Sequence, residues 1–430
     1  MLMDILILHR IPYAKIEYAR GIDHDRHRVT YLGTRAALDT LPADLNCERA
    51  ERPGESATFD EAAAWLDGAG RTFDRIISLS EYELLDAARL RERYGVPGAP
   101  VEQVTLSRDK VLMKQAVVDA GLRAPRFLPL ASFVEGGGAA PWTGATVLKP
   151  HRGASSVDVT VFASAAEAHE AVAGRRSAVA ELDAADRDEA IAAFEVEEFL
   201  EGPVRHYDGL VEDGKVLALS ASEYLGTCLA YAQGLPMGSF QIDCPAEVHD
   251  WVSDVLAAVR IEDGSFHLEA IVHEGELVFL EVGNRVGGAD VVAVFELATG
   301  IHLPSVELRI LLGEQATGLE SGPPAADRPW YGWFVHPGHH LAGEAFEGFD
   351  GADSFRTAPE TLAWNELAPG TPLPGHVTYG AHETALAGIA VTASPERTRQ
   401  WMAELFRSLR IRTTTSSSVK ALGQQNGVPA

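Results

Sequence analysis

Two apolar runs joined by a short turn, "FHLEAIV" and "ELVFLEV", constrain the fold more than any other part of the chain. Their composition and spacing predict a buried antiparallel strand pair. Each run nevertheless contains one acid, Glu269 or Glu281. If the turn is Glu274-Gly275 alone, the two acids point to opposite faces. If the turn covers 274–276, they lie directly opposite each other, with Cβ atoms about 5 Å apart.

Two facing carboxylates repel each other unless a cation lies between them. Oxygen ligands favour Mg²⁺ or Mn²⁺, held jointly with substrate phosphates. The second register therefore predicts a metal site, with His267 and Arg285 on the same face and Asn284 pointing away unless the strand ends or bulges there. The alternative is two glutamates on the exposed face of an amphipathic hairpin. The apolar neighbours argue against it, because a buried carboxylate needs a partner.

Three further segments have the residue types that bind a nucleotide. Lys149 ends the apolar run "ATVLKP", and the following "HRGASS" lets backbone N–H groups approach a phosphate. Lys110 and Lys114 share a helix face. The run "FEVEEFLEG" offers backbone groups and a carboxylate to an adenine. The alternatives are a snorkelling lysine, a solvated helix face and a strand with an acidic outer face. No Walker A pattern is present.

The order of strands and helices predicts several domains, as the length of 430 residues does. The runs "MDILIL", "HRVTYLG" and "FDRIISLS" alternate with helical stretches, which is typical of a parallel sheet. The helix in "SRDKVLMKQAVVDAGL" is expected to start from an N-cap at Ser107. We expect an N-terminal α/β domain (1–104), a small lobe with its lead-in helix (105–202) and a large lobe with the strand pair (203–320). A C-terminal segment (321–412) is expected to pack on the large lobe, and a disordered tail (413–430) is expected to follow it.

The charge and the cysteines exclude several classes of function. A net charge of −26 argues against nucleic acid or an anionic membrane as the main partner. The three cysteines lie far apart without ligand spacing, which fits a reduced cytoplasmic setting and no zinc site. The N-terminal apolar run is too short for a signal peptide, and no run reaches the roughly eighteen apolar residues of a membrane span.

The order of these features resembles the ATP-grasp superfamily, and in particular its carboxylate–amine ligase branch, which includes L-amino acid ligases and natural-product peptide ligases. The resemblance covers about residues 1–312 and is carried by "SRDKVLMK", "ATVLKPHRGASSVDV", "VEEFLEGPVRHYDGLVEDGKV" and "FHLEAIVHEGELVFLEVGNRVGG". It implies an α/β fold in which an N-terminal parallel-sheet domain precedes a two-lobed α+β ATP-grasp clamp.

The resemblance also implies roles for individual residues. The metal ligands would be Glu269 and Glu281, with Asn284 as a third. Lys149 and Arg285 would be catalytic, Arg285 gripping the transferred phosphate or the substrate carboxylate. The ATP contacts would be Lys110, Lys149, Ser155, Ser156, Glu197, Glu198 and Leu200, with His206 or Asp208 replacing the usual ribose-binding glutamate, whose position is Val204 here. The substrate contacts would be His267, Arg285, Tyr231, Gly287 and Gly288, the two glycines allowing a tight turn.

The expected activity is ATP-dependent ligation of an amino acid or other small carboxylic acid to an amine, through an acyl phosphate and with release of ADP. The expected cofactors are ATP and Mg²⁺ or Mn²⁺, and the expected partners are small molecules, with a homodimer left open. Two alternatives remain. One is a carboxylase-type enzyme of the same fold that activates bicarbonate, and the other is a nucleotide-binding protein without turnover.

Overall fold

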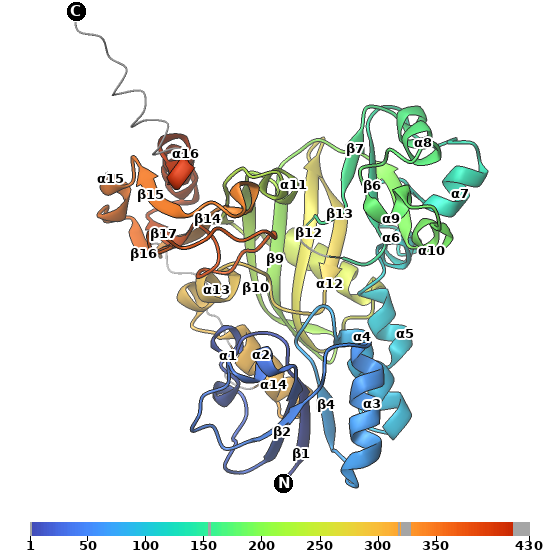
Figure 1. Ribbon diagram of the computed structural model, residues 1–430, viewed down its shortest axis with the longest axis vertical. Helices are drawn as coiled ribbons and strands as arrows, with labels where there is room; N and C mark the ends of the chain where they lie inside the picture. The colour runs from blue at the N-terminus through green and yellow to red at the C-terminus, as the bar shows by residue number, and fades with distance from the viewer. Residues whose placement is uncertain (1, 154–155, 317–318, 320–327, 416–430) are drawn as a thin grey trace, which may run out of the picture.

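The structure is a computed structural model that describes residues 2–153, 156–316, 319 and 328–415. Its strands form one parallel sheet near the N-terminus and three antiparallel sheets. In Figure 1 the N-terminal domain lies below a large central sheet, with the small lobe and the C-terminal part on opposite sides of that sheet. The expected fold class, a parallel-sheet domain followed by a two-lobed α+β clamp, is confirmed.

The N-terminal sheet has the strand order β3-β2-β1-β4 and contains the three predicted strands and one that we did not predict. The additional strand has the sequence Glu-Arg-Ala-Glu, in which only the alanine is buried, so it lacks an apolar signal. The strands are β1 (Asp4–Leu8), β2 (Arg28–Gly33), β3 (Glu48–Glu51) and β4 (Arg75–Ile77). The helices are α1 (Tyr13–Ile16), α2 (Arg35–Leu38), α3 (Thr58–Ala69), α4 (Leu84–Tyr94) and α5 (Val101–Leu106).

The small lobe is a four-stranded sheet of order β5-β8-β6-β7 with helices packed on its apolar side. Its strands are β5 (Phe127–Pro129), β6 (Thr146–Pro150), β7 (Thr160–Phe162) and β8 (Phe194–Glu198). Its helices are α7 (Leu130–Glu135), α8 (Ala165–Ala173), α9 (Ala180–Asp183) and α10 (Asp188–Ala192). Two predicted apolar runs, "ATVLKP" and "FEVEEFLEG", form β6 and β8 and lie side by side in this sheet.

The lead-in helix α6 (Lys110–Asp119) begins later than we expected. Ser107 is not its N-cap, because Ser107 follows the end of α5 and its hydroxyl donates to the Val104 carbonyl. The N-cap is Asp109, whose carboxylate accepts from the N–H groups of Val111 and Leu112. A carboxylate at this position satisfies two N–H groups of the first turn.

The central sheet has eight strands in the order β13-β12-β9-β10-β11-β14-β17-β16. The C-terminal strands β14, β17 and β16 hydrogen-bond into it, so this part of the chain continues the sheet of the large lobe. The strands are β9 (Val204–Glu212), β10 (Lys215–Leu225), β11 (Met237–Ile242), β12 (Gly264–His273), β13 (Glu276–Gly283), β14 (Trp330–His336), β16 (Thr361–Glu366) and β17 (Leu386–Thr392). The helices are α11 (Cys228–Ala232), α12 (Ala246–Ala258), α13 (Val291–Thr299), α14 (Leu303–Leu311), α15 (Asp353–Arg356) and α16 (Pro395–Ser408).

The end of the chain departs from the expected disordered tail at its first residue. Thr413 is buried and is the last residue of β18 (Arg410–Thr413), which pairs with β15 (Phe346–Asp350). Residues 416–430 of the expected tail lie outside the described residues. The same holds for 320–327, at the expected border between the large lobe and the C-terminal segment.

Helix α14 joins the N-terminal domain to the large lobe. Leu308 and Leu312 belong to the apolar core of the N-terminal sheet, whereas Val306 and Ile310 pack against β9 and β10 of the central sheet. Within the described residues no single helix is long and apolar enough to cross a membrane, and α13 with α14 would be so only as a pair bent by 91°.

Candidate active site

The hairpin of β12 and β13 brings Glu269 and Glu281 opposite each other, by a route that we did not predict. The turn is the two-residue one, since His273 pairs with Glu276 and both intervening residues have positive φ. The acids nevertheless face each other because β13 contains a bulge: Ala270 pairs with Phe279, Glu269 pairs with Glu281, and Leu280 between them has no partner. A bulge adds one residue to one strand and reverses the direction of every later side chain.

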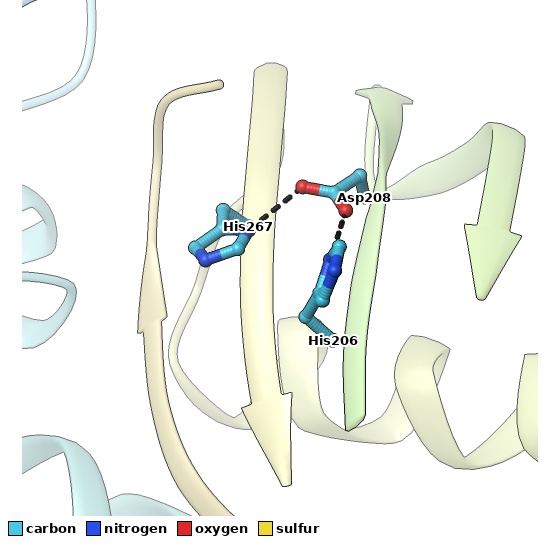
Figure 2. Close-up of side chains that lie close together, drawn as sticks. All are labelled: His206, Asp208 and His267. Atoms are coloured by element: carbon cyan, nitrogen blue, oxygen red, sulfur yellow. Dashed lines mark hydrogen bonds and ion pairs between the residues drawn. The ribbon is translucent and has the colours of Figure 1, made fainter. Parts of the chain in front are cut away.

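Glu269 lies at the end of a row of hydrogen-bonded polar side chains. Its Oε1 accepts from the hydroxyl of Tyr224 at 2.7 Å and lies 3.3 Å from Nε2 of His267. Asp208 accepts from Nδ1 of His267 at 2.7 Å and from Nδ1 of His206 at 2.5 Å (Figure 2). Nε2 of His206 lies 2.6 Å from the hydroxyl of Ser239. We call this set the histidine–carboxylate network: Tyr224, Glu269, His267, Asp208, His206 and Ser239.

The charges in this network shift the pKa values of Asp208 and His267. Burial alone would raise the pKa of Asp208, but the neighbouring His206 and His267 outweigh burial and hold it below its usual value. Burial alone would lower the pKa of His267, but Asp208 and Glu269 raise it to about 9. One oxygen or nitrogen of each of His206, Asp208 and His267 lies within 4.8 Å of the others, as in a metal-binding group. Because their polar atoms already have partners, hydrogen bonding accounts for this geometry.

Glu281 faces the cations of the small lobe and its lead-in helix. Its Oε2 lies 2.9 Å from Nζ of Lys110, which also donates to the carbonyl of Gly153 at 3.1 Å. Burial would raise the pKa of Glu281, but Lys110, Lys149 and Arg285 outweigh burial and hold the pKa well below its usual range. The glycine loop, the first helical lysine and the second acid are therefore in contact.

Lys114, for which a solvated helix face was the alternative to a nucleotide contact, is fully buried. It donates to Glu195 and Glu197, both at 2.6 Å. Lys149 lies 2.6 Å from Glu197 and 3.9 Å from Glu195, and the two lysines hold the pKa of Glu197 well below its usual range although burial would raise it. We call these four residues the Lys–Glu cluster.

Arg285 is paired with an acid of the N-terminal domain. Its Nε donates to Glu81, which also pairs with Arg108, and its Nη1 donates to the Val286 carbonyl at 2.8 Å. A cavity of about 20 Å³ lies between these groups, Lys110, His267 and Glu281. A larger cavity of about 730 Å³ lies elsewhere, between 19–27, 42–46 and the end of α14, and none of the predicted site residues lines it. We place the site at the smaller cavity because the charged groups converge there.

The double glycine after β13 leads into a turn, in which the Val291 N–H donates to the Gly288 carbonyl at 3.3 Å, and it also makes room beside the site. Neither Gly287 nor Gly288 has a positive φ. A Cβ atom on Gly287 would lie 2.8 Å from Oδ1 of Asp208 and 2.9 Å from Nδ1 of His267. Gly287 therefore provides the space in which these two side chains meet.

Several predicted site residues lie apart from this centre or are already engaged. Asn284 donates to the carbonyls of Asp263 and Ser265, and Glu198 pairs with Arg126. The buried hydroxyl of Tyr231 donates to the Thr378 carbonyl at 2.6 Å. Ser156 has a φ of 53°, Leu200 follows the end of β8 and Gly288 is exposed, whereas Ser155 lies outside the described residues.

Sequence reasoning missed several residues of the site. Glu81 follows β4 at the carboxyl end of a parallel strand, where open α/β sheets bind ligands, so its position was a usable signal. Lys114 lies four residues after Lys110, which suggested only a shared face. Tyr224 and Ser239 lie on β10 and β11, and no spacing pattern relates them to Glu269.

The residues of the hairpin fit a magnesium ion. Two carboxylates face each other, and oxygen ligands of this kind suit Mg²⁺ or Mn²⁺. Oε1 of Glu269 takes two hydrogen bonds, and its second oxygen is free to face a cation without losing them. Glu269 and Glu281 would hold the ion, whereas Asn284 would first have to give up its two carbonyl partners.

Comparison with known proteins supports the resemblance. Residues 143–292 match the ATP-grasp domain family. The L-arginine-specific L-amino acid ligase of Bacillus subtilis is 29% identical over 245 residues, which span 55% of this chain and 57% of the relative, little more than half its length. A crystal structure of an L-amino acid ligase from Bacillus licheniformis has a TM-score of 0.69 at 21% identity and covers 95% of this chain and 98% of that one. The biotin carboxylase domain of 2-oxoglutarate carboxylase from Hydrogenobacter thermophilus was solved with MgADP and bicarbonate. It has a TM-score of 0.63 at 13% identity, and the match covers 96% of this chain and 91% of that one.

Proposed function

We propose, from the premise that residues 143–292 are an ATP-grasp domain within an ATP-grasp fold, that this protein is an ATP-dependent carboxylate–amine ligase. The acid substrate would be an amino acid or another small carboxylic acid, and the product an amide or peptide. The observation that supports this most directly is the facing pair Glu269 and Glu281, with Lys110, Lys149 and Arg285 directed at the same centre.

The reaction would proceed through an acyl phosphate. An oxygen of the substrate carboxylate attacks the γ-phosphorus of ATP, the bond from that phosphorus to the β–γ bridging oxygen breaks, and ADP leaves. The amine then attacks the acyl carbon and gives up a proton, and phosphate leaves with the former carboxylate oxygen. When bound, Mg²⁺ would neutralise charge at the β- and γ-phosphates.

The chain's own residues would supply positioning and positive charge. Lys110 and Lys149 reach the site from different elements, so together they could neutralise phosphate oxygens along the triphosphate. Arg285 has a planar guanidinium that can hold two oxygens of a phosphate or carboxylate. In the structure its Nε pairs with Glu81, so engaging a substrate anion would require that pair to open or to be shared.

The test is whether ADP release depends on both an acid and an amine. Purified protein with ATP and Mg²⁺ would be screened against pairs of L-amino acids, arginine included, with ¹⁸O in the acid carboxylate. We expect ADP and phosphate in equal amounts, with the label in phosphate. Stoichiometric AMP and pyrophosphate, or label in AMP, would contradict the proposal. ADP release that requires bicarbonate would indicate a carboxylase-type enzyme, and no release at all a nucleotide-binding protein.

A further inference from the structure

The histidine–carboxylate network holds Glu269 from β9, β10 and β11, and its His267 also lines the small cavity beside Lys110 and Arg285. Both of its donors to Glu269, the Tyr224 hydroxyl at 2.7 Å and His267 Nε2 at 3.3 Å, reach the same oxygen, Oε1. A carboxylate held by one oxygen cannot rotate without breaking these contacts. Its other oxygen, Oε2, is therefore kept in one direction.

The rest of the network fixes His267. Both ring nitrogens of His267 lie within hydrogen-bond distance of carboxylates, Asp208 at 2.7 Å on one side and Glu269 at 3.3 Å on the other. Asp208 is held in turn by His206, and His206 by Ser239. The six side chains come from four neighbouring strands, β12, β9, β10 and β11, and the His206 ring stacks on Tyr224 with centroids 4.6 Å apart. A network that spans four hydrogen-bonded strands has little freedom to move.

We propose that Tyr224 and His267 are positioning residues that fix Glu269 as a ligand through Oε2 alone, with Asp208, His206 and Ser239 holding His267 in place. The inference rests on the proposed function, because that function makes Glu269 a ligand of a divalent cation. A freely rotating glutamate must lose side-chain entropy when it binds an ion, whereas a glutamate already held by neighbours does not. Residues that orient metal ligands commonly change metal affinity about 10–100-fold when they are replaced.

Direct binding of Mn²⁺ to the full chain tests the proposal without an activity assay. Free and bound Mn²⁺ would be measured by electron paramagnetic resonance, with and without ADP. Tyr224→Phe removes one hydroxyl, and we expect it to raise the Kd for Mn²⁺ about tenfold or more. The matched control is Tyr94→Phe, because the Tyr94 hydroxyl donates to the carboxylate of Asp67 at the same 2.7 Å in the N-terminal domain. Its Kd should equal that of the wild type.

Two further measurements separate positioning from a purely structural role. His267→Gln should also weaken Mn²⁺ binding at a temperature where it stays folded. If Tyr224→Phe and His267→Gln lower the melting temperature but leave the Kd unchanged, the proposal is overturned. It is also overturned if wild-type protein binds one equivalent of Zn²⁺ that His206→Gln loses, because the three buried residues would then themselves be a metal centre.

Variants of the acids separate this inference from the proposed function. Glu269→Gln and Glu281→Gln should each weaken Mn²⁺ binding strongly. If they do and the Tyr224 and His267 variants do not, only the positioning role fails. If wild-type protein binds no Mn²⁺, or if neither acid affects its binding, the metal assignment and the proposed function fail together.

Discussion

The Lys–Glu cluster and the histidine–carboxylate network are both made of buried polar and charged side chains, yet they differ in how their charges are balanced. In the cluster two lysines contact two glutamates, and Lys114 and Glu195 have no exposed surface. The network ends at Glu269, opposite Glu281, whose side chain is 35% exposed. The difference suggests that Lys114, Glu195 and Glu197 hold α6 against the sheet of the small lobe, whereas the accessible pair is available for chemistry.

The largest effect should come from the accessible pair. Glu281→Ala is expected to reduce turnover by about a thousandfold or more, since metal-assisted charge stabilisation contributes several kcal/mol. The unfolding free energy should change by less than about 1 kcal/mol, because the pair with Lys110 is partly exposed. Steady-state ADP release and chemical denaturation measure the two quantities. Normal turnover at saturating Mg²⁺, or loss of folded protein, would contradict the division between the regions.

A change in the Lys–Glu cluster should lower the unfolding free energy much more than a change in the accessible pair does. Lys114→Met leaves two buried glutamates with one lysine, and the expected loss of unfolding free energy is about 3–5 kcal/mol. Urea denaturation measures it, with Lys215→Met at an exposed position as the control. The double variant Lys114→Met/Glu195→Leu should recover part of the loss because the remaining charges balance. A loss below about 1 kcal/mol in the single variant would mean that the cluster does not stabilise the fold.

A smaller effect is expected at Arg285, which pairs with Glu81 of the N-terminal domain. Arg285→Lys keeps the charge but loses the two-pronged geometry, so kcat/KM should fall at least about tenfold, or roughly 1.4 kcal/mol. Arg93→Lys is the control, since Arg93 pairs with Asp67 at the surface. Steady-state kinetics of the two variants measures the fall in kcat/KM for each. Near wild-type kinetics in the lysine variant would exclude Arg285 as the group that grips the anion.

The smallest expected effect concerns an acid that belongs to neither region. Glu307 is buried on α14, and burial raises its pKa to about 7, an effect that the neighbouring Ser265 opposes. The folded state therefore holds a proton that the unfolded state releases above about pH 4.5, and the contribution of this carboxyl to stability falls as pH rises from about 4.5 to 7. Glu307→Gln should remove about 1–2 kcal/mol of this decline. Denaturation at pH 5 and pH 8 measures it, and an equal slope in both proteins would contradict it.

Much of the fold could be predicted from the sequence because its signals are local. Alternating apolar runs and helical stretches indicated the N-terminal sheet. The facing acids were one of two registers that we considered. The strands have that register because of a bulge at Leu280, and no residue type in "LVFLEV" predicts a bulge there.

Long-range contacts account for what the sequence did not reveal. Lys114 has no local sign of burial, and its partners Glu195 and Glu197 lie more than seventy residues away on another element. The C-terminal strands β14, β16 and β17 lie among many glycines and prolines, and only pairing with the central sheet makes them part of it. Periodicity describes one element at a time. It therefore cannot show which strands share a sheet or which charged side chains pair with each other.

The bulge in β13 has a consequence for mutation by insertion and deletion. Removing Leu280 would change no predicted site residue, and it would restore a regular ladder from the turn onward. Glu269 would still pair with Glu281, because Leu280 is the residue without a partner. A regular ladder that kept Leu280 would instead pair Glu269 with Leu280 and Glu281 with Leu268, so the two acids would project from opposite faces of the sheet. A relative of this chain could thus keep every acid, lysine and arginine of the site and still lose it if a strand of the same length formed no bulge. Residue identity is therefore a poor guide to whether such a hairpin remains competent, and the pairing of its strands must be known as well.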